Sequence, residues 1–128
     1  MQFSAGQRWA YRAPAGFEAS RIVIGAVAVF PGEPPVMCCS VTGAPRRRPD
    51  GSVDSVTIPF LPMTEQALMA SVTTLDGSDG PAAHFLEALE AWQGDPRGLT
   101  TFTVPFEGFL DRMIALQMAE IVGRTAAA

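Results

Sequence analysis

The first half of the chain alternates between apolar and polar residues in short runs, a pattern typical of β-strands. Residues 7–13 are predicted to form the first strand, and residues 20–30 the second. Alternation in the first strand separates two aromatic from two basic side chains: Trp9 and Tyr11 lie on one face, Arg8 and Arg12 on the other. The second strand is apolar on both faces, which favours the centre of a sheet.

Two further strands are predicted over residues 36–43 and 52–60. Alternation in the later strand places four side chains on one face: Asp54, Val56, Ile58 and Phe60. Residues 44–51 are predicted to be a connection, because the Pro-Asp-Gly near its end is typical of a turn. Short connections between consecutive strands favour an antiparallel meander.

The second half of the chain changes to helical spacing. Helices are predicted over residues 64–75, 81–94 and 105–123, with a short fifth strand over 99–104. Thr64 is the predicted N-cap of the first helix. The predicted apolar faces are Leu68, Val72 and Leu75 in the first helix; Phe85, Leu89 and Trp92 in the second; and Phe106, Leu110, Met113, Ile114, Gln117 and Ile121 in the third.

Together these elements predict an α+β fold. We expect an antiparallel meander sheet of four to five strands in the N-terminal half, with about three helices packed on one face. The length of 128 residues and the 48% hydrophobic content suit one domain, assigned to residues 1–124, with 125–128 as a frayed tail.

The formal net charge of −4 disfavours partners that attract basic proteins, namely nucleic acids and anionic membranes. The longest uncharged apolar stretch, residues 22–30, is far shorter than the roughly 20 residues that span a bilayer. The first residues lack the apolar core of a signal peptide. We therefore expect a cytoplasmic protein without a nucleic-acid or membrane partner.

Cys38 and Cys39 are adjacent in a run of strand-like composition. Successive side chains of a strand point to opposite faces, so the two thiols are not expected to share a metal ion. No Cys-x-x-Cys or histidine-rich spacing supplies further ligands. We predict two buried packing residues, and neither a metal site nor a cofactor.

Few residues are candidates for chemistry. The run Arg46, Arg47, Arg48 could bind a phosphate or carboxylate, although a solvated loop is the favoured interpretation. His84 and Glu87 lie one helical turn apart and could form an acid–base pair. Asp54 and Arg21 are weaker catalytic candidates. No established catalytic or nucleotide-binding motif is present, so a catalytic function is not favoured.

Methionines in the helical half suggest a role in contacts between chains. Met69 and Met118 lie away from the main apolar stripes of their predicted helices, so a second apolar contact is conceivable. The favoured function is a small binding or interaction module, self-associating as a homodimer, that recognises a protein or small ligand. The alternative is a small enzyme or small-molecule binder with a cleft between sheet and helices.

The opening Phe3, Gly6, Trp9 and Tyr11, in the spacing F-x-x-G-x-x-W-x-Y, resembles the start of a family of short uncharacterised bacterial proteins. Later positions that resemble the same family are residues 20–25, Pro62, Thr64, Leu68, Ser71, Val72 and Trp92. Some relatives have a histidine where this chain has Phe60. The family has no assigned activity, so the resemblance implies one conserved-length domain and no chemistry.

Overall fold

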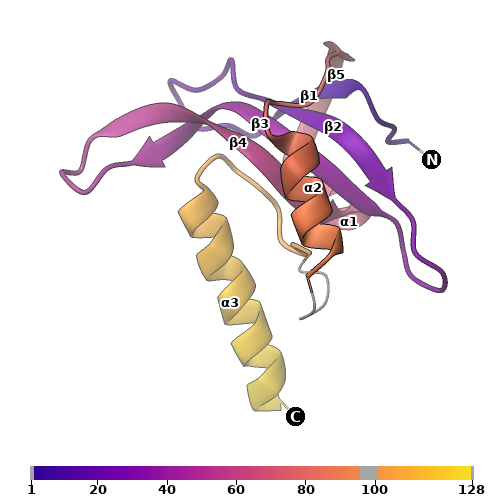
Figure 1. Cartoon of the computed structure of the whole chain (residues 1–128). Helices are drawn as coiled ribbons and strands as arrows, with labels where there is room; N and C mark the ends of the chain where they lie inside the picture. The colour runs from indigo at the N-terminus through magenta and orange to yellow at the C-terminus, as the bar shows by residue number, and fades with distance from the viewer. Residues whose placement is uncertain (1, 96–100, 128) are drawn as a thin grey trace.

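The computed structural model describes residues 2–95 and 101–127 and contains a five-stranded antiparallel sheet and three helices (Figure 1). The strands are β1 (Gln7–Tyr11), β2 (Arg21–Ala28), β3 (Val36–Arg47), β4 (Val53–Thr64) and β5 (Val72–Ser78). The helices are α1 (Glu65–Ser71), α2 (Phe85–Gln93) and α3 (Leu110–Ala127). The prediction of an α+β fold with an N-terminal antiparallel sheet is therefore confirmed.

The strands lie in the order β4-β3-β2-β1-β5, so the first four form a meander and β5 pairs with the free edge of β1. The prediction of a helix over residues 64–75 is wrong for its second half. Thr64 caps α1 as predicted, its Oγ1 accepting from the Ala67 N–H at 3.1 Å. The helix ends at Ser71, and Val72, Thr73 and Thr74 continue as a strand, because β-branched residues suit an edge that can pair.

The connection predicted over residues 44–51 is also mostly strand. β3 extends to Arg47 and β4 begins at Val53, so the two form a long hairpin with a short turn. In that turn the Arg48 N–H donates to the Ser52 carbonyl at 2.8 Å, and Gly51 has a φ of +88°. The Pro-Asp-Gly signal located the turn correctly, but the strands on either side reach closer to it than predicted.

The predicted face of β4 is divided by an irregularity in pairing. Between two paired positions β4 advances three residues, from Ile58 to Leu61, while β3 advances two, from Val41 to Cys39. The extra residue turns Phe60 to the opposite face from Val56 and Ile58, as a bulge does. The prediction that these side chains share one face is therefore wrong.

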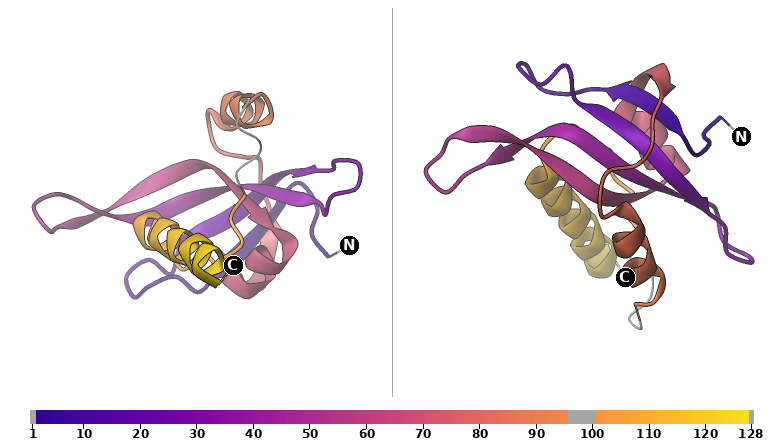
Figure 2. Two further views of the ribbon diagram at one scale, coloured as in Figure 1. Left: turned by 90° about the horizontal axis from the view of Figure 1, so that it is seen from below. Right: turned by 45° about the horizontal axis from the view of Figure 1, so that its top comes forward.

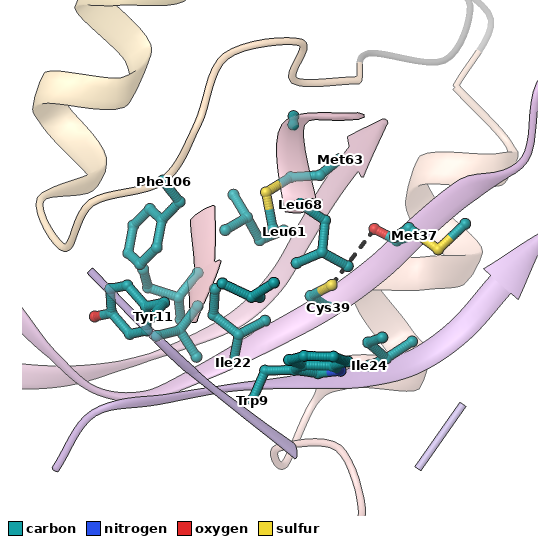
Figure 3. Packing of buried hydrophobic residues seen from close by; sticks show 14 of the residues in the cluster. Trp9, Tyr11, Ile22, Ile24, Met37, Cys39, Leu61, Met63, Leu68 and Phe106 are labelled. Carbon is teal, nitrogen blue, oxygen red and sulfur yellow. Dashed lines mark hydrogen bonds between the residues drawn. The ribbon is translucent and has the colours of Figure 1, made fainter. Parts of the chain in front are cut away.

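The main core lies on one face of the sheet (Figure 3). Trp9 and Tyr11 point into it as predicted, and the Tyr11 and Phe106 rings lie 5.2 Å apart. Helix α1 and the segment before α3 cover this face. Ser71 joins them, since its Oγ accepts from the Phe106 N–H at 2.8 Å and donates to the Ala67 carbonyl at 2.7 Å.

Helix α2 covers the opposite face, so the helices do not pack on one face as predicted (Figure 2). Phe85 and Trp92 of α2 are buried there with Cys38, while Cys39 is buried in the main core. The two thiols thus lie on opposite faces and are buried, as predicted, and both are free cysteines. Gly25 in β2 leaves room for the Phe85 ring, because a Cβ at Gly25 would lie 2.4 Å from its Cζ.

Helix α3 begins at Leu110, five residues later than predicted, and runs away from the sheet (Figure 1). Phe102, in the predicted strand 99–104, makes a single parallel bridge to Met63. Residues 99 and 100 of that strand lie outside the described part of the chain. The segment from Phe102 to Phe109 therefore links a sheet edge to the start of a projecting helix.

Candidate functional site

Two of the three consecutive arginines are bound to one carboxylate. Arg46 donates from Nε and Nη2 to the two oxygens of Asp54, at 3.1 and 2.8 Å. Arg48 donates from Nε and Nη2 to Asp54 Oδ2, at 2.9 and 2.6 Å. The hydrogen bond from Arg46 is the largest cause that lowers the pKa of Asp54, to about 2. Asp54 is therefore an ionised partner for these arginines at neutral pH.

Arg47 has a different role from its neighbours. Its Nη1 lies 3.3 Å from Asp111 Oδ2, and its guanidinium lies 4.3 Å from the centre of the Phe109 ring. Alternation along β3 separates Arg47 from Arg46, so the run does not form one cluster. All three predicted anion-binding arginines bind carboxylates of their own chain.

Arg21 belongs to a second pair of arginines around a carboxylate. Its Nε donates to Asp76 Oδ2, and Arg8 Nε lies 3.8 Å from the same oxygen. Arg8 Nη2 also donates to the Asp76 carbonyl at 2.8 Å. Hydrogen bonding from Arg21 is the first cause that lowers the pKa of Asp76. The helical spacing of residues 64–75 gave no signal for Asp76 as a partner of arginine, whereas in the structure β5 lies beside β1 and brings Asp76 to Arg8 and Arg21.

Two shallow hollows share Thr42, which pairs with Arg21 across the β2–β3 ladder. One, of about 520 Å³, includes Asp54 and Ser20 in its lining. The other, of about 380 Å³, lies between the sheet and the start of α2 and includes His84. The predicted cleft between sheet and helices would lie here, but besides Thr42 and His84 the described lining includes only small or apolar residues such as Thr57, Pro59 and Ala82, which offer a ligand few charged groups.

The predicted pair of His84 and Glu87 does come together. His84 Nδ1 lies 3.4 Å from Glu87 Oε1, and both side chains are largely exposed to solvent. His84 has a φ of +67° at the N-cap of α2 and makes no side-chain capping bond. An exposed pair is surrounded by water and lacks the enclosed surroundings that tune groups for acid–base catalysis.

The structure brings none of the other catalytic candidates to His84. Asp54 and Arg21 are held in separate ion pairs on the sheet. Across residues 2–95 and 101–127, no group of three histidine, cysteine or acidic side chains is placed to hold a metal ion. Burial raises the pKa of the Cys38 thiol to about 11 and raises that of Cys39 further, which disfavours the reactive thiolate.

Helix α3 has one packed side and one exposed apolar side. Met113 is buried and Leu110 packs against the main core. Gln117 belongs to the same side, its Oε1 accepting from the Thr103 N–H at 2.9 Å. Next to this side lies a row of large apolar residues that face solvent: Ile114, Met118, Ile121 and Val122.

The exposed row differs from the face predicted for this helix. Ile114 and Ile121 were expected in the core, but they are 46% and 41% exposed. Met118 and Val122 are 56% and 60% exposed. The predicted face fails because the body of the protein contacts α3 mainly near its start, so only the residues that face the 102–109 segment are covered. An exposed apolar row of this length is typical of a contact surface.

No family model, no curated protein and no solved structure matches the chain. The resemblance seen at Phe3, Gly6, Trp9 and Tyr11 stays a prediction. In the described part of the chain, no helix combines the length and the apolar character needed to cross a membrane.

Proposed function

We propose that the protein is a small interaction module that associates with a second copy of itself through helix α3. The observation that carries this proposal is the row of half-exposed apolar side chains on a helix that runs away from the sheet (Figure 1). In a monomer these side chains contact water, at a free-energy cost that association would remove. The charged clusters support ligand binding less well, since their groups are already paired.

The chemistry of α3 favours a protein surface as its partner. The exposed row contains three branched aliphatic residues and a methionine, and the helix is about 27 Å long from its 18 residues. One helix face is smaller than a standard protein interface. Association is therefore expected to depend on concentration, with a Kd roughly in the micromolar range or weaker.

Sedimentation equilibrium between roughly 10 and 500 μM tests the proposal in the concentration range set by that affinity. The wild-type mass should rise from 13.6 kDa toward twice that value. The double variant Ile114→Glu, Met118→Glu should stay monomeric, because burying two carboxylates against an apolar partner is unfavourable. Wild type that remains monomeric at the highest concentration would refute the proposal.

Leu86→Glu is the matched control. Leu86 is 67% exposed on α2, so the substitution places the same charge on an exposed apolar position of another helix. This variant should dimerise like wild type. Circular dichroism and thermal unfolding should show that all three proteins are folded. Equal loss of dimer in the Leu86 and α3 variants would indicate a charge effect and would exclude α3 as the specific interface.

A further inference from the structure

We infer that Gln117 is a positioning residue that holds the second half of α3 in one orientation, ready for association. Its side-chain oxygen Oε1 accepts from the Thr103 N–H at 2.9 Å. The Thr103 hydroxyl, which has one proton to donate, lies 3.3 Å from the same oxygen and 3.2 Å from Glu120 Oε2. These contacts join α3 to the segment from Phe102 to Phe109, alongside which the helix runs back from its beginning (Figure 1). The effect on association rests on the proposed function.

The segment that carries Thr103 is itself fixed to the rest of the protein on both sides of this residue. The Phe102 N–H donates to the Pro62 carbonyl at 2.9 Å, and the Thr64 N–H donates to the Phe102 carbonyl at 3.0 Å. On the other side of Thr103, Phe106 is buried in the main core. Thr103 is therefore held in place by the sheet and the core, and its hydrogen bonds restrain α3 relative to the sheet.

Hydrogen bonds hold this part of α3 because apolar burial does not. Met113 is buried, whereas every residue from 114 to 123 is at least partly exposed. The least exposed residues in that range are Gln117 and Glu120, the two that contact Thr103. A region with few buried apolar contacts opens at a low free-energy cost. Loss of the bonds to Thr103 should therefore free the helix beyond Met113.

A helix held in one orientation binds a partner more tightly than a mobile one, because ordering a mobile element on association costs free energy. The exposed row runs from Ile114 to Val122, so it lies in the part of α3 that Gln117 holds. Gln117 faces Thr103 and lies beside the row, so it can hold the helix without being part of the contact surface. Loss of its side chain should therefore weaken association although the row itself is unchanged.

Gln117→Ala tests the inference, since it removes the acceptor and leaves the exposed row as it is. Hydrogen exchange is measured by NMR at a concentration where the protein is monomeric. The amides of Thr103 and of residues 118–123 should exchange about two- to tenfold faster, as expected for the loss of one ordinary hydrogen bond. The dimer Kd from sedimentation equilibrium should rise by a similar factor. Thr103→Val removes the hydroxyl and keeps the N–H, so it should give a smaller rise in exchange.

Gln66→Ala is the matched control, because Gln66 is an exposed glutamine on α1 and its loss should leave α3 exchange and the Kd as in wild type. Unchanged exchange in Gln117→Ala would overturn the inference. Faster exchange with an unchanged Kd would also overturn it, since α3 would then not need to be held for association, and the proposed function would stand. If wild type stays monomeric at every concentration, the proposed function fails, whereas faster exchange in Gln117→Ala would still support Gln117 as the residue that holds the helix.

Discussion

Helices α2 and α3 differ in how much of their apolar surface is buried against the rest of the protein. Helix α2 has nine residues and lies along the sheet, with Phe85 and Trp92 buried in an aromatic cluster. Helix α3 has 18 residues, yet Met113 is its one side chain that is fully buried among residues 110–123. The length of a helix therefore does not determine how firmly it is held; burial of large side chains against a partner does.

Helix α2 is buried more completely than α3 because its aromatic side chains pack against aromatic side chains of the sheet. Phe60 lies 5.6 Å from both Phe85 and Trp92, and Phe30 lies 6.0 Å from Trp92, measured between ring centres. Helix α3 has aliphatic residues instead, and most of them face solvent. The short aromatic face is thus covered within one chain, whereas the longer aliphatic face stays largely exposed to solvent.

Phe85→Ala should have the largest effect on stability. Phe85 is 1% exposed, and removal of a buried phenylalanine side chain costs about 3–5 kcal/mol. Ile114→Ala on α3 should change the free energy of unfolding by less than about 0.5 kcal/mol, since its side chain is half exposed. Urea denaturation at low protein concentration measures both values. Equal losses for the two variants would show that α3 is held as firmly as α2.

Gly25→Ala should have the next largest effect, because it acts on the same contact from the sheet. The added methyl group would lie 2.4 to 2.7 Å from three atoms of the Phe85 ring, so the ring and α2 must move. Overpacking of this kind costs about 1–3 kcal/mol. Thermal or urea unfolding measures the loss, and exchange of α2 amides should rise with it.

Gly80→Ala provides the control for the glycine substitution. A Cβ at Gly80 would meet no atom within 4 Å, and its φ is not in the left-handed region. The variant should be as stable as wild type or more stable by up to about 1 kcal/mol, because alanine lowers the entropy of the unfolded chain. If Gly25→Ala behaves like this control, Phe85 is not held against the strand as described.

Local patterns predicted the parts of the fold that depend on neighbouring residues. Alternation at Trp9 and Tyr11 identified an inward face, and the helical spacing of Phe85, Leu89 and Trp92 identified the packed side of α2. Opposite orientation of Cys38 and Cys39 followed from strand geometry alone. In each case the residues that determine the structure lie within a few positions of one another.

The failures depend on partners far away in the sequence. Residues 72–78 became a strand because β1 offers a free edge; their β-branched residues suit a strand, but no pattern within them identifies β1 as the partner. Bulged pairing with β3 turned Phe60 to the other face. Asp54 and the arginines were each predictable as candidates, but the hydrogen bonds of Arg46 and Arg48 to the one Asp54 carboxylate were not. The spacing of apolar residues along α3 also could not show that the rest of the protein would leave most of this helix exposed.

Arg47→Ala should have a smaller effect than the Phe85 and Gly25 substitutions, and a more local one. Arg47 joins the sheet to the beginning of α3 through Asp111 and the Phe109 ring, contacts that contribute about 0.5–1 kcal/mol at an exposed site. Loss of that amount should speed hydrogen exchange of the first α3 amides about two- to fivefold where exchange occurs by local opening. Arg46→Ala is the control, since Arg46 binds Asp54 and should leave α3 exchange unchanged. Unchanged exchange in Arg47→Ala would mean that apolar packing at Leu110 and Met113 alone holds the helix, which would make the difference between α2 and α3 purely one of buried area.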